Sequence, residues 1–97
     1  AHTLANLSTA VTRAQPFFFR TSDGYELDLV LDWGTKRWAV EIKLTSDPST
    51  DMISRLHKTA DMIGAVRRIL VCRTARTIEN NTLLVTNLSD WLKKLAE

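Results

Sequence analysis

Residues 25–44, YELDLVLDWGTKRWAVEIKL, constrain the fold most, because they read as two strands joined by one glycine turn. Apolar and polar side chains alternate over residues 25–33 and again over 36–44, which predicts two half-buried strands. Glycine in the first place of a two-residue loop is typical of a type II′ turn, so Gly34 and Thr35 are predicted to form it. This turn sets the register of the hairpin, with Trp33 opposite Lys36.

The same register places four charged side chains on one face of the hairpin. It sets Asp28 opposite Glu41 and Glu26 opposite Lys43, because side chains alternate between faces with a period of two. The Glu26–Lys43 pair is favourable and needs no function to explain it. Asp28 and Glu41 would repel each other, so one of them takes up a proton or the two bind a cation. A metal site and an ordinary charged surface are both open at this point.

The other face of the hairpin is wholly apolar and is expected to pack on helices. Its side chains are Leu27, Leu29, Leu31, Trp33, Trp38, Val40, Ile42 and Leu44. The charged face also carries Val30 and Ala39, so it is not expected to be a plain solvated surface.

The remaining elements predict an α/β sandwich with a mixed sheet. In chain order, the pattern indicates a helix over 2–14, strands over 17–20, 25–33 and 36–44, a helix between Pro48 and Gly64, strands over 67–72 and 82–86, and a last helix after Asn87. Asp47 is the expected cap of the second helix and Asn87 the cap of the third. Strands joined by short loops are expected to be antiparallel, and a strand reached through a helix parallel.

Composition limits the class of protein more than its activity. The 97 residues, 44% of them hydrophobic and 25% charged, suit one globular domain over 1–97 and exclude a mainly disordered chain. The net charge of +2 permits DNA contact without arguing for it. The single cysteine, Cys72, is expected in the core, and a cytoplasmic location is expected. No membrane partner is expected, because no apolar run is long enough for a membrane span.

The acidic residues of the hairpin then carry a resemblance. Asp28 followed by Glu41-Ile42-Lys43 resembles the Asp…Glu-x-Lys signature of the PD-(D/E)XK superfamily, the restriction-endonuclease-like nucleases. This resemblance implies a three-layer core with a mixed sheet, in the order αβββαββα, flanked by helices. The segment FFFRTSDGYELDLVLDWGTKRWAVEIKLTSDPS is similar, more closely, to a C-terminal domain of unknown function that follows the ATPase module in prokaryotic AAA-type ATPases.

The resemblance implies a role for each site residue. Asp28, Glu41 and the backbone carbonyl of Ile42 would bind Mg²⁺ or Mn²⁺, and Lys43 would orient the attacking water. Glu26 would hold Lys43 or support the metal site, so the implied catalytic set is Asp28, Glu41, Lys43 and Glu26. The implied activity is Mg²⁺-dependent hydrolysis of DNA phosphodiesters. The chain would then be the C-terminal part of a longer protein, with an upstream ATPase domain as a partner. Separately, Phe17, Phe18 and Phe19 cannot all point inward, so a helix or a partner such as a second copy is expected to cover one side.

The chain departs from the family pattern at two places, and the second departure favours an alternative function. Leu27 stands where the superfamily name has proline, which is a common change. The predicted first helix, AHTLANLSTAV, has no acidic residue, although active members usually carry one there. By the family pattern this residue would fall upstream of Ala1. The alternative is therefore a catalytically degenerate module that binds DNA or protein.

Arginines are scattered along the chain and would form a phosphate-binding rim if several converged beside Asp28. They are Arg13, Arg20, Arg37, Arg67, Arg68, Arg73 and Arg76.

Overall fold

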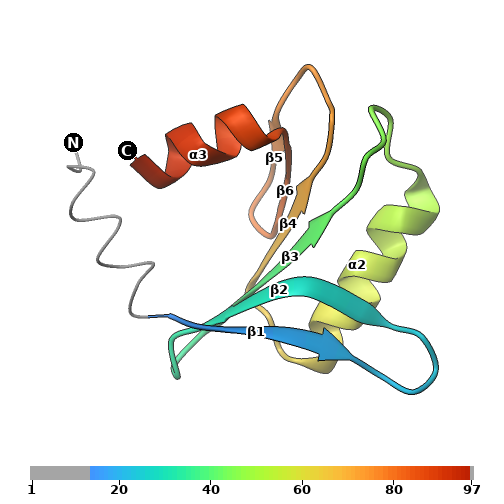
Figure 1. The fold of residues 1–97 in the computed structure, drawn as a ribbon, viewed down its shortest axis with the longest axis vertical. Coiled ribbons are helices and arrows are strands. Elements are labelled where there is room, and N and C mark those ends of the chain that lie inside the picture. The colour runs from blue at the N-terminus through green and yellow to red at the C-terminus, as the bar shows by residue number, and fades with distance from the viewer. Residues whose placement is uncertain (1–13, 97) are drawn as a thin grey trace.

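The protein, as a computed structural model that describes residues 14–96, has a six-stranded mixed sheet with a helix on each face (Figure 1). In chain order the elements are β1 Gln15–Arg20, β2 Glu26–Asp32, β3 Arg37–Ile42, α2 Thr50–Met62, β4 Arg67–Val71, β5 Ile78–Glu79, β6 Leu83–Thr86 and α3 Leu88–Ala96. The predicted α/β class with a mixed sheet flanked by helices is confirmed. The helix predicted over 2–14 lies outside the described residues, apart from Ala14.

The strand order across the sheet is β1-β2-β3-β4-β6-β5. The first three strands form an antiparallel meander, and β4, reached through α2, is parallel to β3, both as predicted. Strand β6 is also parallel to β4, because the intervening connector carries the short strand β5 and returns the chain to the same end of the sheet. The sequence indicated only a polar connector there, so β5 was missed. Its two residues are too few to produce a pattern.

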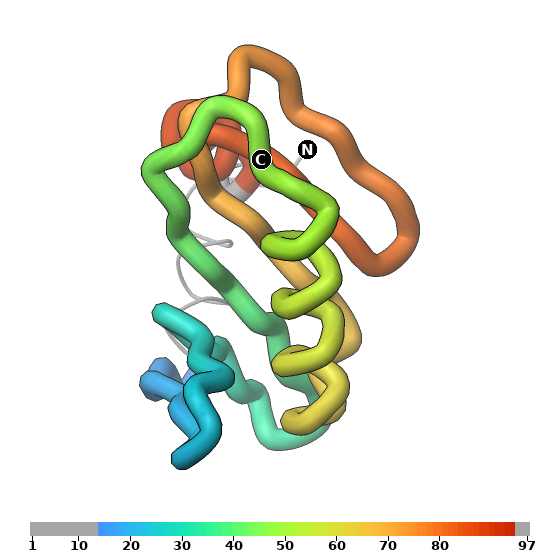
Figure 2. The backbone as a smooth tube through the Cα atoms, turned by 90° about the vertical axis from the view of Figure 1, so that its right-hand side faces the viewer, coloured from blue at the N-terminus to red at the C-terminus, as the bar shows by residue number. Residues whose placement is uncertain are grey.

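Two core layers lie on opposite faces of the sheet, since Ile69 and Leu70 are consecutive in β4 and belong to different layers. On one face α2 contributes Leu56 and Ala60 to the larger layer. On the other face Trp91 of α3 packs against the smaller layer. Figure 2 shows α2 in front of the strands and α3 behind them. Cys72 is buried, as predicted.

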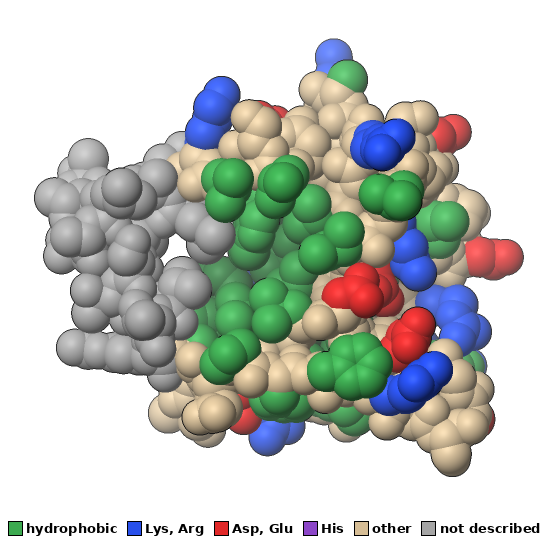
Figure 3. Space-filling view, viewed as in Figure 1, with side chains coloured by type: hydrophobic (Ala, Val, Ile, Leu, Met, Phe, Trp, Pro, Cys, Tyr) green, Lys and Arg blue, Asp and Glu red, His purple; other side chains and the backbone are tan. Residues whose placement is uncertain are grey.

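The face of the sheet on the α3 side is only partly covered within the described residues. Figure 3 shows hydrophobic side chains gathered over the sheet beside α3, with the surface hollowed between them and acidic side chains at the border. Ile42 and Leu44 of the predicted apolar face are 53% and 78% exposed. The expectation that this whole face packs on helices is therefore wrong at the end of β3.

The turn between β2 and β3 is the predicted one. Gly34 has a φ of +86°, whereas Thr35 does not have a positive φ, and the Trp33 N–H donates to the Lys36 carbonyl at 3.0 Å. A positive φ at the first central residue alone is the mark of a type II′ turn. The register follows as predicted from Asp32–Arg37 back to Leu29–Val40.

Beyond Leu29–Val40 the predicted register fails, because β2 contains a bulge. Between β1 and β2 the paired residues run from Phe17–Val30 to Phe19–Leu27, so β2 has one extra residue in this interval. The bulge turns Leu27 into the α2 layer, where it is fully buried together with Val30. Leu27 was predicted on the opposite face. Asp28–Glu41 and Glu26–Lys43 are therefore not ladder pairs of the β2–β3 hairpin.

Helix α2 begins two residues later than the sequence indicated. Ser49, and not Asp47, caps it, because the Ser49 hydroxyl accepts the Met52 N–H at 3.2 Å. Gly64 follows its end with a φ of +66°, as predicted. Asn87 caps α3 as predicted, with its side-chain oxygen accepting the Asp90 N–H at 2.7 Å. The position of α2 decides which of its side chains face the charged end of β3.

Candidate functional site

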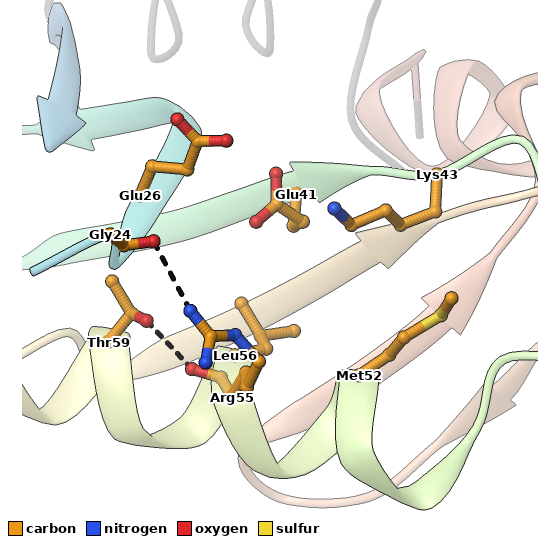
Figure 4. Close-up of a pocket in the computed structure, with 8 residues that line it drawn as sticks. All are labelled: Gly24, Glu26, Glu41, Lys43, Met52, Arg55, Leu56 and Thr59. Carbon is orange, nitrogen blue, oxygen red and sulfur yellow. Dashed lines mark hydrogen bonds between the residues drawn. The ribbon is translucent and has the colours of Figure 1, made fainter.

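A pocket of about 210 Å³ lies between α2 and the ends of β2 and β3 (Figure 4). Three of the four predicted catalytic residues line it, namely Glu26, Glu41 and Lys43. The other lining residues come from the turn before β2 and from α2: Gly24, Met52, Arg55, Leu56 and Thr59. The fourth predicted residue, Asp28, contacts Glu41 directly. The structure thus brings the predicted set together, although not through the predicted ladder.

Glu41 is the buried member of the set, with only 9% of its surface exposed. It sits near the end of β3, where alternation turns it toward α2, next to Leu70 of β4. Its carboxyl group shares a hydrogen bond with that of Asp28. Two ionised carboxylates are both acceptors, so such a bond requires one proton, and Glu41 donates it.

The pKa values of the two carboxyl groups move apart for the same reason. Burial, then the hydrogen bond and charge of Asp28, raise the pKa of Glu41 to about 8. The hydrogen bond from Glu41, the Ile42 N–H and the charge of Lys43 hold the pKa of Asp28 below its ordinary value. At neutral pH the pair therefore carries one negative charge, on Asp28.

Asp28 owes its position to the bulge and to one backbone hydrogen bond. Its Oδ2 accepts the Ile42 N–H at 2.8 Å, just past the point where the ladder ends. The Asp28 carboxylate therefore accepts the hydrogen bond that a backbone carbonyl of β2 would accept if the ladder continued. In a strand the N–H and C=O of one residue point to the same side, so the Ile42 carbonyl is also directed toward β2.

Lys43 continues β3 past its last ladder residue. Its N–H donates to the Val71 carbonyl at 2.9 Å, which keeps this segment against β4. Figure 4 shows its side chain extending toward the Glu41 carboxyl group. This charge lowers the pKa of both Asp28 and Glu41, as an ammonium beside a carboxylate must.

Glu26 does not pair with Lys43 as predicted. Its carboxylate lies 3.7 Å from the guanidinium of Arg20, the residue opposite it in β1. This ion pair is exposed and stabilises the fold by less than about 1 kcal/mol. Glu26 still raises the pKa of Glu41, so its charge reaches the pocket.

The donor set suits a hard divalent ion that keeps several waters. Between residues 14 and 96 no group of three or more His, Cys, Asp or Glu side chains is gathered to hold a metal. Asp28, Glu41 and the Ile42 carbonyl offer three oxygens, and Mg²⁺ commonly takes one or two carboxylates plus water and substrate phosphate. Glu41 must release its proton to act as a ligand. The residues present therefore fit Mg²⁺ or Mn²⁺ but not a closed protein-only cage.

Sequence reasoning missed the contribution of α2 to the pocket. Arg55 lines it, with its guanidinium donating to the Gly24 carbonyl at 3.2 Å. One face of the helix is formed by residues at helical spacing, Met52, Arg55, Leu56 and Thr59. This spacing is visible in the sequence, but it identifies pocket residues only when the helix face toward the hairpin is known. Three of the arginines considered for a phosphate-binding rim do not converge beside Asp28. Arg37, Arg67 and Arg68 pair with carboxylates away from the pocket.

A family model for DUF4143, a domain of unknown function, matches residues 1–91. The chain belongs to the DUF4143 family. The match takes in every residue of the pocket, including the Asp28–Glu41 pair. The predicted membership in a domain family of unknown function is confirmed, while the ATPase context remains a prediction.

No curated protein matches the chain. Among solved structures, Hjc, a Holliday junction resolvase of Archaeoglobus fulgidus, is similar over 81% of this chain and 79% of that chain, with 17% sequence identity and a TM-score of 0.49. No helix in the described part of the chain is long and apolar enough to cross a membrane.

Proposed function

We propose that this DUF4143 domain is a metal-dependent nuclease domain that hydrolyses DNA phosphodiesters. The observation that carries the proposal is the pairing of the buried Glu41 carboxyl group with the exposed Asp28 carboxyl group, which share one proton beside Lys43 at the edge of a pocket. A structural ion pair would join opposite charges. Two carboxyl groups held so close that the pKa of one of them is strongly raised are typical of a catalytic or metal-binding site.

Each residue of the site has a separate role in the proposed hydrolysis. Asp28, ionised Glu41 and the Ile42 carbonyl would hold Mg²⁺ or Mn²⁺, which when bound polarises the phosphodiester and acidifies its water. Lys43 orients the attacking water and offsets the negative charge that grows on the phosphate. Water adds to phosphorus, one P–O ester bond breaks, and the leaving oxygen takes up a proton, which gives a phosphate monoester and a hydroxyl end. Glu26, the first residue of β2, adds a negative charge to the wall of the pocket.

The opposite candidate is a degenerate module that binds DNA or protein, as the C-terminal domain of an AAA-type ATPase in the cytoplasm. The observation that favours it is that residues 14–96 gather no group of three or more His, Cys, Asp or Glu side chains able to hold a metal ion. Burial and Asp28 also raise the pKa of Glu41, so this carboxyl group must lose its proton before a cation binds. Both candidates keep the fold and differ in whether metal displaces this proton.

Cleavage assays of the intact protein test the nuclease proposal. Linear and circular DNA are incubated with Mg²⁺, with Mn²⁺ and with EDTA, and cleavage is expected only with metal. Lys43→Met is expected to lower the cleavage rate about 100-fold, the scale of a lost acid–base or water-orienting group, with metal affinity nearly unchanged. Lys93→Met removes an exposed lysine of α3 outside the pocket and serves as the control. Intact DNA under all metal conditions would rule the proposal out.

A further inference from the structure

The turn before β2 and the middle of α2 together form a cationic rim at the mouth of the pocket. The rim consists of Arg55 and Lys58 with the ring of Tyr25 between the two elements. The Arg55 guanidinium lies 4.5 Å from the centroid of the Tyr25 ring, and the Lys58 ammonium 5.5 Å. These are cation–π distances.

The turn that carries Tyr25 is tied down by its own hydrogen bonds. Thr21 exchanges backbone contacts with Tyr25, since the Thr21 N–H donates to the Tyr25 carbonyl at 2.8 Å and the Tyr25 N–H to the Thr21 hydroxyl at 3.0 Å. The Thr21 hydroxyl also bonds Asp23. The motif RTSDGY is therefore a fixed platform for the two cations of α2.

Both cations keep free hydrogen-bonding capacity. Arg55 uses one N–H on the Gly24 carbonyl, and a guanidinium has five. Within residues 14–96 neither Arg55 nor Lys58 forms an ion pair, whereas Arg37, Arg67 and Arg68 each do. Asp23 is an exposed carboxylate whose pKa is lowered by its hydrogen bond from Thr21 and by the charges of Arg55 and Lys58. Arg55 and Lys58 therefore have N–H donors that face solvent and have no acceptor within residues 14–96.

We infer that Arg55 and Lys58 bind the nucleic-acid backbone and position it on the pocket. Arg55 lines the same pocket as Glu41 and Lys43, and Figure 4 shows it rising from α2 toward the turn opposite those residues. Because Glu41 and Arg55 line one pocket, a strand with a phosphate at the carboxylate pair would pass beside the rim. Tyr25 holds the two cations in place, so less side-chain freedom is lost on binding. The inference rests on the proposed function for its ligand and adds the residues that hold that ligand.

DNA binding without metal tests the rim separately from cleavage. The affinity of a fluorescent oligonucleotide is measured in EDTA over a series of salt concentrations, for the intact protein and the double variant Arg55→Gln/Lys58→Gln. The variant is expected to bind about 10-fold more weakly at low salt. Its log–log salt slope should fall by nearly 2, because about 0.9 of a counterion is released for each phosphate neutralised.

The double variant Arg76→Gln/Lys93→Gln is the matched control, since it removes the same charge from exposed residues outside the pocket. It is expected to change the affinity by less than threefold. Thermal unfolding of all variants separates lost binding from lost folding. Wild-type protein that fails to bind at low salt, or a rim variant that binds like the control, overturns the inference. If the rim variant alone loses binding and the wild type cuts no DNA, the inference stands and the nuclease proposal fails.

Discussion

Replacing Glu41 with glutamine is expected to stabilise the protein at pH 8.5 and to leave its stability nearly unchanged at pH 5. Burial and Asp28 raise the pKa of Glu41 from 4.5 to about 8. Between these values the folded chain holds a proton that the unfolded chain has released, so the free energy of unfolding falls as the pH rises. The slope is at most about 1.4 kcal/mol per pH unit, and the loss from pH 5 to pH 8 is on the order of 3 kcal/mol.

The glutamine side chain keeps the hydrogen bond to Asp28 and carries no charge to desolvate, which removes this loss. The lowered pKa of Asp28 acts in another window, because its contribution is complete above pH 4 and is lost only as the pH falls further. Urea unfolding in EDTA at pH 5, 7 and 8.5 measures the effect. Glu79→Gln is the control, since Glu79 is an exposed carboxylate whose pKa is lowered by Lys94 and Arg67. Equal wild-type stability at pH 5 and pH 8.5 would refute the protonated state of Glu41.

Asp28→Asn is expected to reduce metal-dependent DNA cleavage about 1,000-fold or more. Asparagine can still accept the Ile42 N–H, so the end of the hairpin is preserved. It lacks the charge that binds the cation, and a catalytic metal supplies several kcal/mol of transition-state stabilisation. Initial cleavage rates of the intact protein in saturating Mn²⁺ give the measurement.

Asp32→Asn is the matched control for Asp28→Asn. Asp32 lies on the same strand, and its carboxylate also accepts a backbone N–H, from Gly34 of the adjoining turn at 2.7 Å. It faces Arg37 instead of a second carboxyl group. Similar stability in the two variants, with activity lost only from Asp28→Asn, is the expected result. Cleavage at the wild-type rate by Asp28→Asn would exclude Asp28 from the site.

The turn and the nearest half of the hairpin could be predicted because local chemistry decides them. Gly34 favours one turn type, the turn fixes the register, and alternation then places Val30 and Ala39 on one face, where both are buried. The presence of Asp28, Glu41 and Lys43 at one end of the sheet followed from the same register.

The arrangement within the site could not be predicted, because a bulge leaves no mark in an alternating sequence. The extra residue of β2 lies where this strand must pair with both β1 and β3. Only the packing of the whole sheet decides which strand carries the bulge. It buries Leu27, ends the ladder at Leu29 and lets Asp28 reach a backbone N–H. The role of Arg55 was hidden for a similar reason, since it depends on how α2 packs over the hairpin.

A divalent cation is expected to displace the proton shared by Asp28 and Glu41. Calorimetric titration of the intact protein with Mn²⁺ at pH 7, in two buffers of different ionisation enthalpy, measures the bound ion and the released proton together. We predict one ion bound at this site, close to one proton released on binding, and loss of both in Asp28→Asn but not in Asp32→Asn. Absence of binding at millimolar Mn²⁺, or binding without proton release that persists in Asp28→Asn, would contradict the claim.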